Sequence, residues 1–312
     1  MKISSIIPKV LFWSFRVVFR LTELTVPSLA NRWVVRLWFT PFRAAGTAKG
    51  GTAMSSARVG RLPFARRHHT DSTGDHIVAY HWGKGPRILL VHGWGGSAAQ
   101  LSDLVNPLVE AGFSVASFDA PAHGASPGRR TDPFEIGAAL KAVEAEYGPF
   151  HGIVSHSMGA AVTGLALRDG VSIPAFTAIA PPASFETYPR QFALKTGISR
   201  RTLRFLLDYL KSRFGNLNEK FSFFSPQNLG IAPGLIILDR QDREVDFEEA
   251  STLAQDWPNT VVKVTDGLGH TRILRDAGVI STVVTYMLST LQSAKSGSPK
   301  SHDSYGNFRA IG

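Results

Sequence analysis

The sequence predicts an α/β protein built on a mainly parallel, doubly wound sheet. Between residues 76 and 291, short apolar runs bounded by glycine or proline alternate with longer segments of helical pattern, an order that is typical of βαβ units. The 312 residues are 44% hydrophobic and 19% charged, which is the composition of a globular protein rather than a disordered one. The chain has no cysteine, which excludes disulfides, thiolate catalysis and cysteine-based metal sites.

The strands are predicted from runs of β-branched and aliphatic residues that follow turn-forming residues. A strand over 76–82 follows the polar stretch Asp71–Asp75, and a buried strand over 87–91 follows the turn Gly83–Pro86. Later strands are expected over 113–118, 151–155, 175–180, 235–238 and 261–264. Helices are expected between and after them, over 98–111, 133–147, 158–168, 246–257 and 273–291.

One segment interrupts this alternation. Ala183–Ile231 has no clear strand, and its apolar residues recur at helical spacing at Leu203, Leu206, Leu207, Leu210 and Phe214. A helical insertion between two strands of an α/β sheet usually covers the carboxyl ends of the strands, where ligand sites lie. We therefore expect a helical lid over about 183–231, with a plain packing excursion as the alternative.

The basic charge of the chain is concentrated at its N-terminus. Residues 1–67 hold 12 Lys/Arg and a single acid, Glu23, whereas the rest of the chain carries 22 basic and 23 acidic residues. This distribution argues against a nucleic-acid partner, because a nucleic-acid-binding domain carries its basic residues on the folded face. It favours contact of the N-terminus with an anionic surface such as lipid headgroups.

Two apolar segments in this leader have the pattern of amphipathic helices. The charged residues of 5–24 fall on one narrow stripe of the helix, at Lys9, Arg16, Arg20 and Glu23. The second segment, 29–40, carries Arg32 and Arg36 one turn apart. Neither segment has the ~18 uncharged apolar residues of a spanning helix. We expect a cytoplasmic protein. Two interpretations of these helices are open, packing on the protein body and peripheral contact with an anionic membrane through residues 1–40, and an organelle-targeting peptide is a third.

Three parts of the chain are therefore predicted. Residues 1–60 form a basic helical leader that ends in a flexible Ala-, Gly-, Thr- and Ser-rich linker over 44–60, residues 61–292 form the α/β domain, and residues 293–312 form a disordered tail.

His68, His69, Asp71, Asp75 and His76 lie close in sequence, but their spacing fits no helical pair of metal ligands. A solvated hairpin without a metal is expected there.

The motif most informative about chemistry is Ser155-His156-Ser157-Met158-Gly159, between the strand predicted over 151–155 and the helix over 158–168. A serine at such a strand–turn–helix stands above the sheet, and only small residues fit two positions before and after it. The usual form is G-x-S-x-G, and Ser155 replaces the first glycine. Ser157 is thus a candidate nucleophile, with a serine-rich turn as the alternative.

A glycine-rich loop, His92-Gly93-Trp94-Gly95-Gly96, follows the buried strand over 87–91. It can direct backbone N–H groups toward the serine, and we predict that the N–H groups of Trp94 and Met158 form an oxyanion hole. The alternative is a turn whose glycines serve close packing only. Asp119 and His123, in the loop after the next strand, are expected to order that loop by hydrogen bonding.

A nucleophilic serine needs a base and an acid that orients the base. The strand over 235–238 is followed by Asp239, Asp242 and Glu244, and the strand over 261–264 is followed by a loop that holds His270. Serine, acid and histidine thus occur in this order, each at the carboxyl end of a strand. That arrangement can bring all three side chains to one edge of the sheet.

Taken together, these motifs resemble the α/β-hydrolase superfamily over about residues 71–291, and Ser157 resembles the nucleophile of its serine esterase- and lipase-like branch. The resemblance implies the α/β-hydrolase fold, Ser157 as nucleophile and His270 as base. The family's acid lies in a strand–H-G-x-x-D-x-x-V pattern, which places it on Asp242. Because Leu238-Asp239 stand where the family has His-Gly, Asp239 is the alternative acid.

The resemblance implies hydrolysis of a carboxylic ester or thioester through an acyl-Ser157 intermediate, without a metal or an organic cofactor. The substrate is expected to be a small acyl ester or thioester with a partly apolar chain, because the helical insertion carries Phe205, Leu206, Tyr209 and Leu210. Two other functions fit the same motifs. One is a non-catalytic α/β-hydrolase-like binding protein, and the other is a perhydrolase- or peroxidase-like enzyme with the same triad.

Overall fold

The computed structural model describes residues 6–42, 51–66, 69, 76–171, 174–217, 234–257 and 260–296. The chain divides into two compact units. The helical unit comprises Met1–Thr40 and Ser184–Lys220, and the sheet unit comprises Pro41–Ala183 and Phe221–Gly312. Each unit therefore draws on two stretches that are far apart in the sequence.

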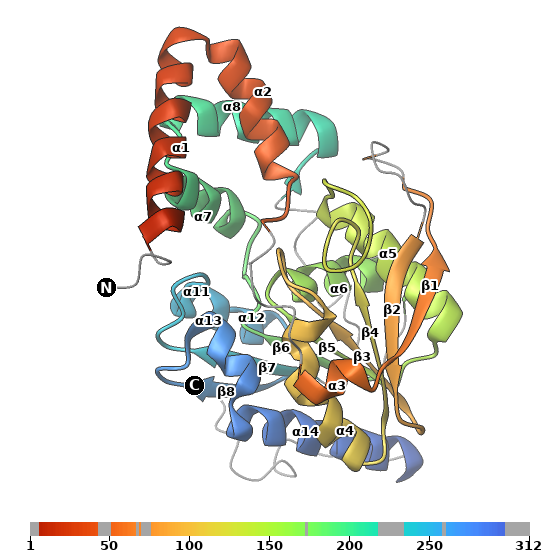
Figure 1. The fold of residues 1–312 in the computed structure, drawn as a ribbon. Coiled ribbons are helices and arrows are strands. Elements are labelled where there is room, and N and C mark those ends of the chain that lie inside the picture. The colour runs from red at the N-terminus through yellow and green to blue at the C-terminus, as the bar shows by residue number, and fades with distance from the viewer. Residues whose placement is uncertain are drawn as a thin grey trace. The chain divides into compact units, whose positions relative to one another are not determined.

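Within its described residues, the sheet unit contains an eight-stranded sheet in the order β1-β2-β4-β3-β5-β6-β7-β8 (Figure 1). β2 is antiparallel to both of its neighbours, β1 and β4, and every other neighbouring pair is parallel. The mainly parallel sheet predicted from the sequence is therefore confirmed. The strands are β1 Arg58–Pro63, β2 His76–Trp82, β3 Arg87–Val91, β4 Ser114–Asp119, β5 Gly152–His156, β6 Phe176–Ile179, β7 Gly234–Asp239 and β8 Thr260–Thr265.

The central strands are apolar along most of their length because both faces of the sheet are covered. Ile88, Leu89 and Leu90 of β3 are fully buried, as is typical of a parallel strand between two helical layers. A core cluster joins one face of the sheet to η2 (Ala98–Leu104), α4 (Val105–Glu110) and α14 (Ala277–Ser296). Figure 1 shows α5 (Pro133–Tyr147) and α6 (Met158–Arg168), which pack on each other, on the side of the sheet away from α14.

The predicted elements over 76–82, 87–91, 133–147 and 158–168 coincide with β2, β3, α5 and α6.

Three predicted helices are subdivided. The helix over 98–111 begins as a 3-10 helix and becomes α-helical at Val105, which places Pro107 in the first turn, where its missing N–H is tolerated. The helix over 246–257 is divided into α11 (Phe247–Ser251) and α12 (Leu253–Asp256). The helix over 273–291 begins as the 3-10 turn η3 (Ile273–Arg275), and Asp276 Oδ1 accepts from the Val279 N–H at the start of α14.

The flexible linker predicted for 44–60 is wrong for residues 51–60. Gly51–Ser55 form the short helix α3, and β1 begins at Arg58. The indole N–H of Trp82 donates to the carbonyl of Ala53 at 2.6 Å, and β1 pairs with β2 over its full length. The small and polar residues of this segment show no apolar pattern, and β1 is ordered by its pairing with β2, the next strand along the chain. Residues 43–50 lie outside the described part of the chain.

His69 also differs from the solvated hairpin predicted around it. Its side chain is buried, and its Nε2 lies 3.2 Å from Oδ2 of Asp132. Beside it, Arg66 forms a buried ion pair of 2.6 Å with Glu135. These groups attach the chain before β2 to the start of α5, where Asp132 accepts from the Glu135 N–H as N-cap. His68, Asp71 and Asp75 lie outside the described residues.

The helical unit combines the leader with the insertion, which the sequence presents as separate segments. Its described helices are α1 (Ile6–Thr25), α2 (Pro27–Trp38), α7 (Thr187–Thr196) and α8 (Arg200–Phe214). Ring contacts join the two stretches: the Trp38 ring lies edge-on to Phe192 at 5.2 Å, and the Phe39 ring lies 6.1 Å from Phe214. Both contacts link α2 and its C-terminal end to the insertion. The leader is thus packed within the protein on one side.

None of the described helices is both long enough and apolar enough to cross a membrane. Of the tail predicted over 293–312, residues 293–296 belong to α14 and residues 297–312 lie outside the described chain. Residues 218–233, which include the end of the predicted lid, also lie outside the described chain.

Candidate active site

Ser157 lies at the sharp turn between β5 and α6. Its backbone has φ 51° and ψ −124°, a conformation that costs a non-glycine residue about 1–3 kcal/mol and persists only where the surroundings impose it. The Ser157 N–H donates to the carbonyl of Ile179 at 3.0 Å, which ties the turn to the neighbouring strand β6. The side chain of Ser157 is thereby held at the carboxyl end of the sheet.

Gly159 and Ser155 show how the sequence permits this turn. A Cβ added at Gly159 would lie 2.5 Å from the Val91 carbonyl oxygen, so α6 could not approach β3 with any larger residue there. The Ser155 side chain is fully buried, with its Oγ 2.8 Å from Oγ1 of Thr163. Thr163 in turn donates its only hydroxyl hydrogen to the Gly159 carbonyl at 2.8 Å. Ser155 is therefore the donor to Thr163, and a hydroxyl chain joins the strand to the helix.

The glycine-rich loop over 92–96 lies directly beside the turn. A Cβ added at Gly93 would lie 3.1 Å from Ser157 Cβ and 3.2 Å from the His156 carbonyl oxygen, so close packing explains this glycine. The next residue, Trp94, carries one of the two N–H groups predicted to bind an oxyanion. Met158, which carries the other, is the first residue of α6, where backbone N–H groups have no acceptor within the helix. Gly93, which precedes Trp94, thus packs against Ser157, and Met158 follows Ser157 directly in the chain.

His270 and Asp242 form the hydrogen-bonded pair predicted from their positions after β8 and β7. The Nδ1 of His270 lies 2.8 Å from Oδ2 of Asp242, and both side chains are largely buried. The other carboxylate oxygen, Oδ1, accepts from the N–H groups of Glu244 (2.7 Å) and Val245 (3.0 Å). Burial alone would raise the pKa of Asp242, but the hydrogen bond and charge of His270 and these two N–H groups outweigh it and hold the pKa below its usual value.

Asp239, the alternative acid, has different partners. Its Oδ1 accepts from the N–H groups of Gln241 and Gly269, and its Oδ2 accepts from the Leu268 N–H and the Thr265 hydroxyl, at 2.8–3.0 Å. Burial would raise the pKa of Asp239, but these hydrogen bonds hold it below its usual value. Asp239 thus fixes the loop that leads to His270, and the geometry favours Asp242 as the partner of the imidazole.

His156, which directly precedes Ser157, contacts His270. Its Nε2 lies 2.9 Å from the His270 carbonyl oxygen, and the two ring centroids are 4.7 Å apart. The Nδ1 of His156 is buried and has no hydrogen-bond partner among the described residues. Burial, followed by the nearby His270 ring, lowers the pKa of His156 to about 3. His156 is therefore neutral and donates through Nε2. The sequence shows only that His156 precedes Ser157, and nothing in it predicts the hydrogen bond to the His270 carbonyl.

The Asp119 loop has the ordering role predicted for it. Asp119 accepts from the Ala98 N–H (2.8 Å), the Ala125 N–H (2.7 Å) and the Tyr80 hydroxyl (2.9 Å). His123 Nδ1 lies 3.0 Å from the Pro121 carbonyl oxygen. The prediction that these residues order a loop by hydrogen bonding is confirmed.

Two arrangements are absent from the described part of the site, a hydrogen bond between Ser157 and His270 and a group of metal-binding side chains. Within the described residues, no hydrogen bond joins the Ser157 hydroxyl to His270, the pair that would transfer a proton. In many hydrolases such contacts tighten only when substrate binds. No group of three or more His, Asp or Glu side chains in the described residues is arranged to hold a metal ion.

Comparison with known proteins decides the family. A model of the alpha/beta hydrolase family matches residues 88–282, which is well over half of the chain. The chain belongs to this family. The match includes the Ser157 turn, Asp242 and His270. A comparison with curated proteins found no match.

Solved structures of other alpha/beta hydrolases support the fold. The chain resembles the esterase Pf2001 of Pyrococcus furiosus with a TM-score of 0.55 and 20% identity, over 81% of this chain and 96% of that one. A thioesterase domain of the curacin biosynthetic pathway matches with a TM-score of 0.54 and 14% identity, over 75% and 99%. A bromoperoxidase of Bacillus anthracis matches with a TM-score of 0.53 and 15% identity, over 74% and 100%. At these identities the likeness establishes the alpha/beta hydrolase fold and not the substrate.

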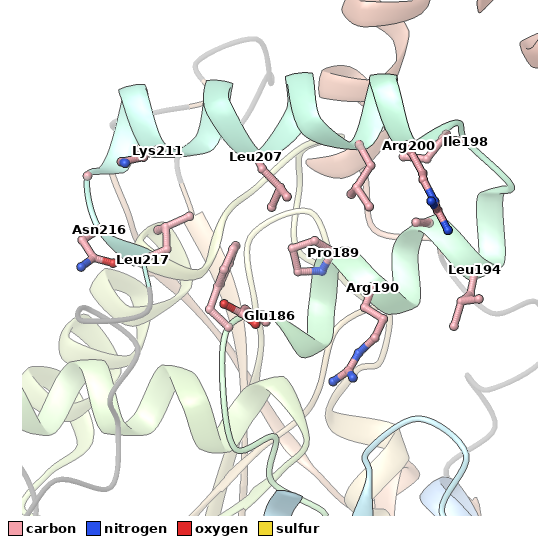
Figure 2. Close-up of a pocket in the computed structure, with 14 residues that line it drawn as sticks. Glu186, Pro189, Arg190, Leu194, Ile198, Arg200, Leu207, Lys211, Asn216 and Leu217 are labelled. Atoms are coloured by element: carbon pink, nitrogen blue, oxygen red, sulfur yellow. The ribbon is translucent and has the colours of Figure 1, made fainter.

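The helical unit has a groove of its own, with a volume of about 1060 Å³, between α7 and α8 (Figure 2). Its walls are largely apolar, and Arg190, Arg200 and Lys211 lie along it. Apolar lining residues include Pro189, Leu194, Ile198, Leu203, Leu207 and Leu217. Every residue of the groove lies between Phe185 and Leu217, so none of the predicted catalytic residues belongs to it.

Proposed function

We propose that this alpha/beta hydrolase cleaves a carboxylic ester or thioester through an acyl-Ser157 intermediate. The observation that supports this most strongly is the 2.8 Å hydrogen bond between His270 Nδ1 and Asp242. It fixes the ring so that Nδ1 carries hydrogen and Nε2 has a free lone pair, which is the tautomer that a general base needs. The strained Ser157 turn supplies the matching nucleophile.

In the proposed reaction, Nε2 of His270 removes the hydroxyl proton as Ser157 Oγ attacks the acyl carbonyl carbon. The N–H groups of Trp94 and Met158 stabilise the negative oxygen of the tetrahedral intermediate. The carbon–oxygen or carbon–sulfur bond to the leaving group then breaks, and His270 passes its proton to the leaving alcohol or thiol. Water, deprotonated by His270, attacks the acyl-serine and releases the carboxylic acid. Asp242 stabilises the imidazolium at both stages, and no cofactor takes part.

The expected substrate has a partly apolar acyl chain. Support comes from the apolar composition of the helical insertion, which carries Phe205, Leu206 and Leu210. The esterase and thioesterase among the similar structures are consistent with either leaving group. The direct test is a panel of p-nitrophenyl esters and acyl thioesters of graded chain length, assayed with wild type and Ser157→Ala. We expect hydrolysis that depends on Ser157 and increases beyond acetyl; a rate that is equal in the two proteins would contradict the proposal.

A non-catalytic binding protein is the second candidate, and the missing hydrogen bond between Ser157 and His270 is the observation that favours it. A folded wild-type protein that neither hydrolyses the panel nor reacts with an active-site phosphonate would support this alternative. A peroxidase-like function shares the triad and would appear as halide oxidation in the presence of hydrogen peroxide and a carboxylic acid.

A further inference from the structure

The outer side of α1 carries large apolar side chains that nothing in the described residues covers. At 100° per residue, Trp13, Leu24, Val17 and Leu21 fall within an arc of about 80°, and Val18 extends this arc to about 140°. We refer to these five residues as the α1 face. Their exposed fractions are 63% for Trp13, 55% for Val17, 51% for Val18, 56% for Leu21 and 81% for Leu24. A contiguous apolar patch of this kind on a folded protein marks an interaction surface.

The orientation of this face is fixed by the opposite side of α1. Phe19 is buried, and its ring lies 6.4 Å from Trp33 of α2. Glu23, also on the inner side, accepts from the N–H (2.9 Å) and the hydroxyl (2.8 Å) of Ser199 at the start of α8. The inner side therefore packs within the helical unit, and α1 cannot turn its apolar face inward without breaking these contacts.

The charge around the α1 face has one sign. Glu23 is the single acid among residues 6–42, and its side chain is only 6% exposed because Ser199 and Arg20 hold it. Burial would raise the pKa of Glu23, but hydrogen bonds from Thr202 and Ser199 and the charge of Arg20 hold it below its usual value. Arg20, at the edge of the apolar arc, is 54% exposed. The exposed charged group at the edge of the arc is therefore cationic, and the other exposed polar residues of the arc, Ser14 and Thr25, are neutral.

Trp13, at one edge of the α1 face, carries the kind of amphipathic ring that is enriched at the boundary between water and lipid. The Arg16 guanidinium carbon lies 5.4 Å from the centroid of this ring, and the same group lies beside Gly197 of the helical unit, where an added Cβ would meet its Nε at 2.2 Å. A second copy of the chain would place cations against cations around the patch. An anionic bilayer offers both an apolar layer and negative headgroups.

We propose that the α1 face binds the headgroup–acyl boundary of an anionic lipid bilayer, with α1 lying in the plane of the membrane. Trp13, Val17, Leu21 and Leu24 enter the upper acyl region, and Arg20 contacts lipid phosphates or carboxylates. The proposal is independent of the reaction proposed at Ser157.

Co-sedimentation with vesicles tests this proposal on the full chain. Wild type is expected to bind phosphatidylcholine vesicles that contain phosphatidylserine, to bind pure phosphatidylcholine more weakly, and to be released as salt screens the charges. The double variant Leu21→Asn/Leu24→Asn should lose roughly tenfold or more of its affinity, because two leucine side chains no longer enter the apolar layer. Arg20→Glu should weaken binding to the anionic vesicles selectively.

The matched control is Leu194→Asn. Leu194 is 68% exposed and belongs to α7 of the same helical unit, not to the five residues of the α1 face, so this variant should bind vesicles like wild type. Helical circular dichroism and the melting temperature show whether each variant is folded. Failure of folded wild type to bind anionic vesicles would overturn the proposal. So would dimerisation in solution that the double variant abolishes, because a second copy would then be the occupant of the face.

Discussion

The Nε2 of His156 donates a hydrogen bond to the backbone carbonyl of His270 at 2.9 Å. His156 directly precedes Ser157 in the chain, so the segment that carries the proposed nucleophile also holds the backbone of the proposed base. Asp239 fixes the same loop from the other side through the N–H groups of Leu268 and Gly269. The position of the imidazole is thus set by its backbone as well as by Asp242.

Removal of the His156 donor is expected to lower kcat more than it changes KM. His156→Phe keeps an aromatic ring but leaves the His270 carbonyl without its donor, and a lost hydrogen bond of about 1 kcal/mol corresponds to a rate loss of roughly five- to tenfold. His156→Gln keeps an N–H donor at a similar reach and should recover part of this loss. Steady-state kinetics on the best ester of the panel measures both variants. Equal rates for the Phe and Gln variants would show that the hydrogen bond does not position the base.

Stability should depend on pH through His156. Because the pKa of His156 is lowered to about 3 in the folded protein and is about 6.5 in an unfolded chain, the unfolded state binds more protons between these values. Folding stability from this residue therefore falls as pH decreases from about 7 toward 3, by roughly 1 kcal/mol between pH 7 and pH 5.5. Urea unfolding of wild type and His156→Gln at these two pH values measures the effect. A midpoint shift of the same size in both proteins would contradict it.

The two acids after β7 should respond differently to replacement by asparagine. Asp242→Asn removes the charge that stabilises the His270 imidazolium and disturbs its tautomer, so kcat should fall by about 10³- to 10⁴-fold with modest loss of stability. Asp239→Asn leaves N–H donors of the loop without a full set of acceptors, which should cost about 1–3 kcal/mol of unfolding free energy and a smaller part of kcat. Kinetics and thermal unfolding of both variants provide the comparison. If Asp239→Asn loses more of kcat than Asp242→Asn while still folded, the roles must be exchanged.

Replacement of Ser155 by glycine, the usual residue of this motif, should not raise the stability of the protein. Ser155→Gly breaks the hydroxyl chain through Thr163 to Gly159, and we expect a loss of about 1–2 kcal/mol in unfolding free energy. A double variant with Thr163→Val should cost less than the sum of the two single changes, because the hydroxyls act as a pair. Denaturant melts of the four proteins complete the cycle. Full additivity, or a gain in stability from the glycine, would contradict this interpretation.

The sequence was sufficient for seven strands of the sheet, β2 to β8, and for the order of the candidate site motifs. Runs such as Ile88–Val91 and Leu235–Leu238 are apolar because they are covered on both faces, and this pattern is visible without a structure. Contacts between separate segments were not visible. The pairing of β1 with β2 and the packing of α1 and α2 on the insertion arise from partners that no local pattern specifies.

The same distinction applies to the site. Asp242 and His270 were found because each follows a strand at the family's spacing, and their hydrogen bond agrees with that prediction. His156 and Thr163 were missed because each acts through specific side-chain hydrogen bonds. His156 bonds to a backbone carbonyl 114 residues away, and Thr163 bonds to a serine in a position where the family has glycine. Residue type alone does not reveal such contacts.

The most direct test of the account is covalent labelling by a fluorophosphonate, which reacts only with a serine that its surroundings activate. The predicted result is one phosphonate per chain, located by peptide mass spectrometry on Ser157, with no labelling of Ser157→Ala and slower labelling of Asp242→Asn. Absence of labelling in folded wild type, or a phosphonate on a different serine, would contradict the assignment of Ser157 as the nucleophile.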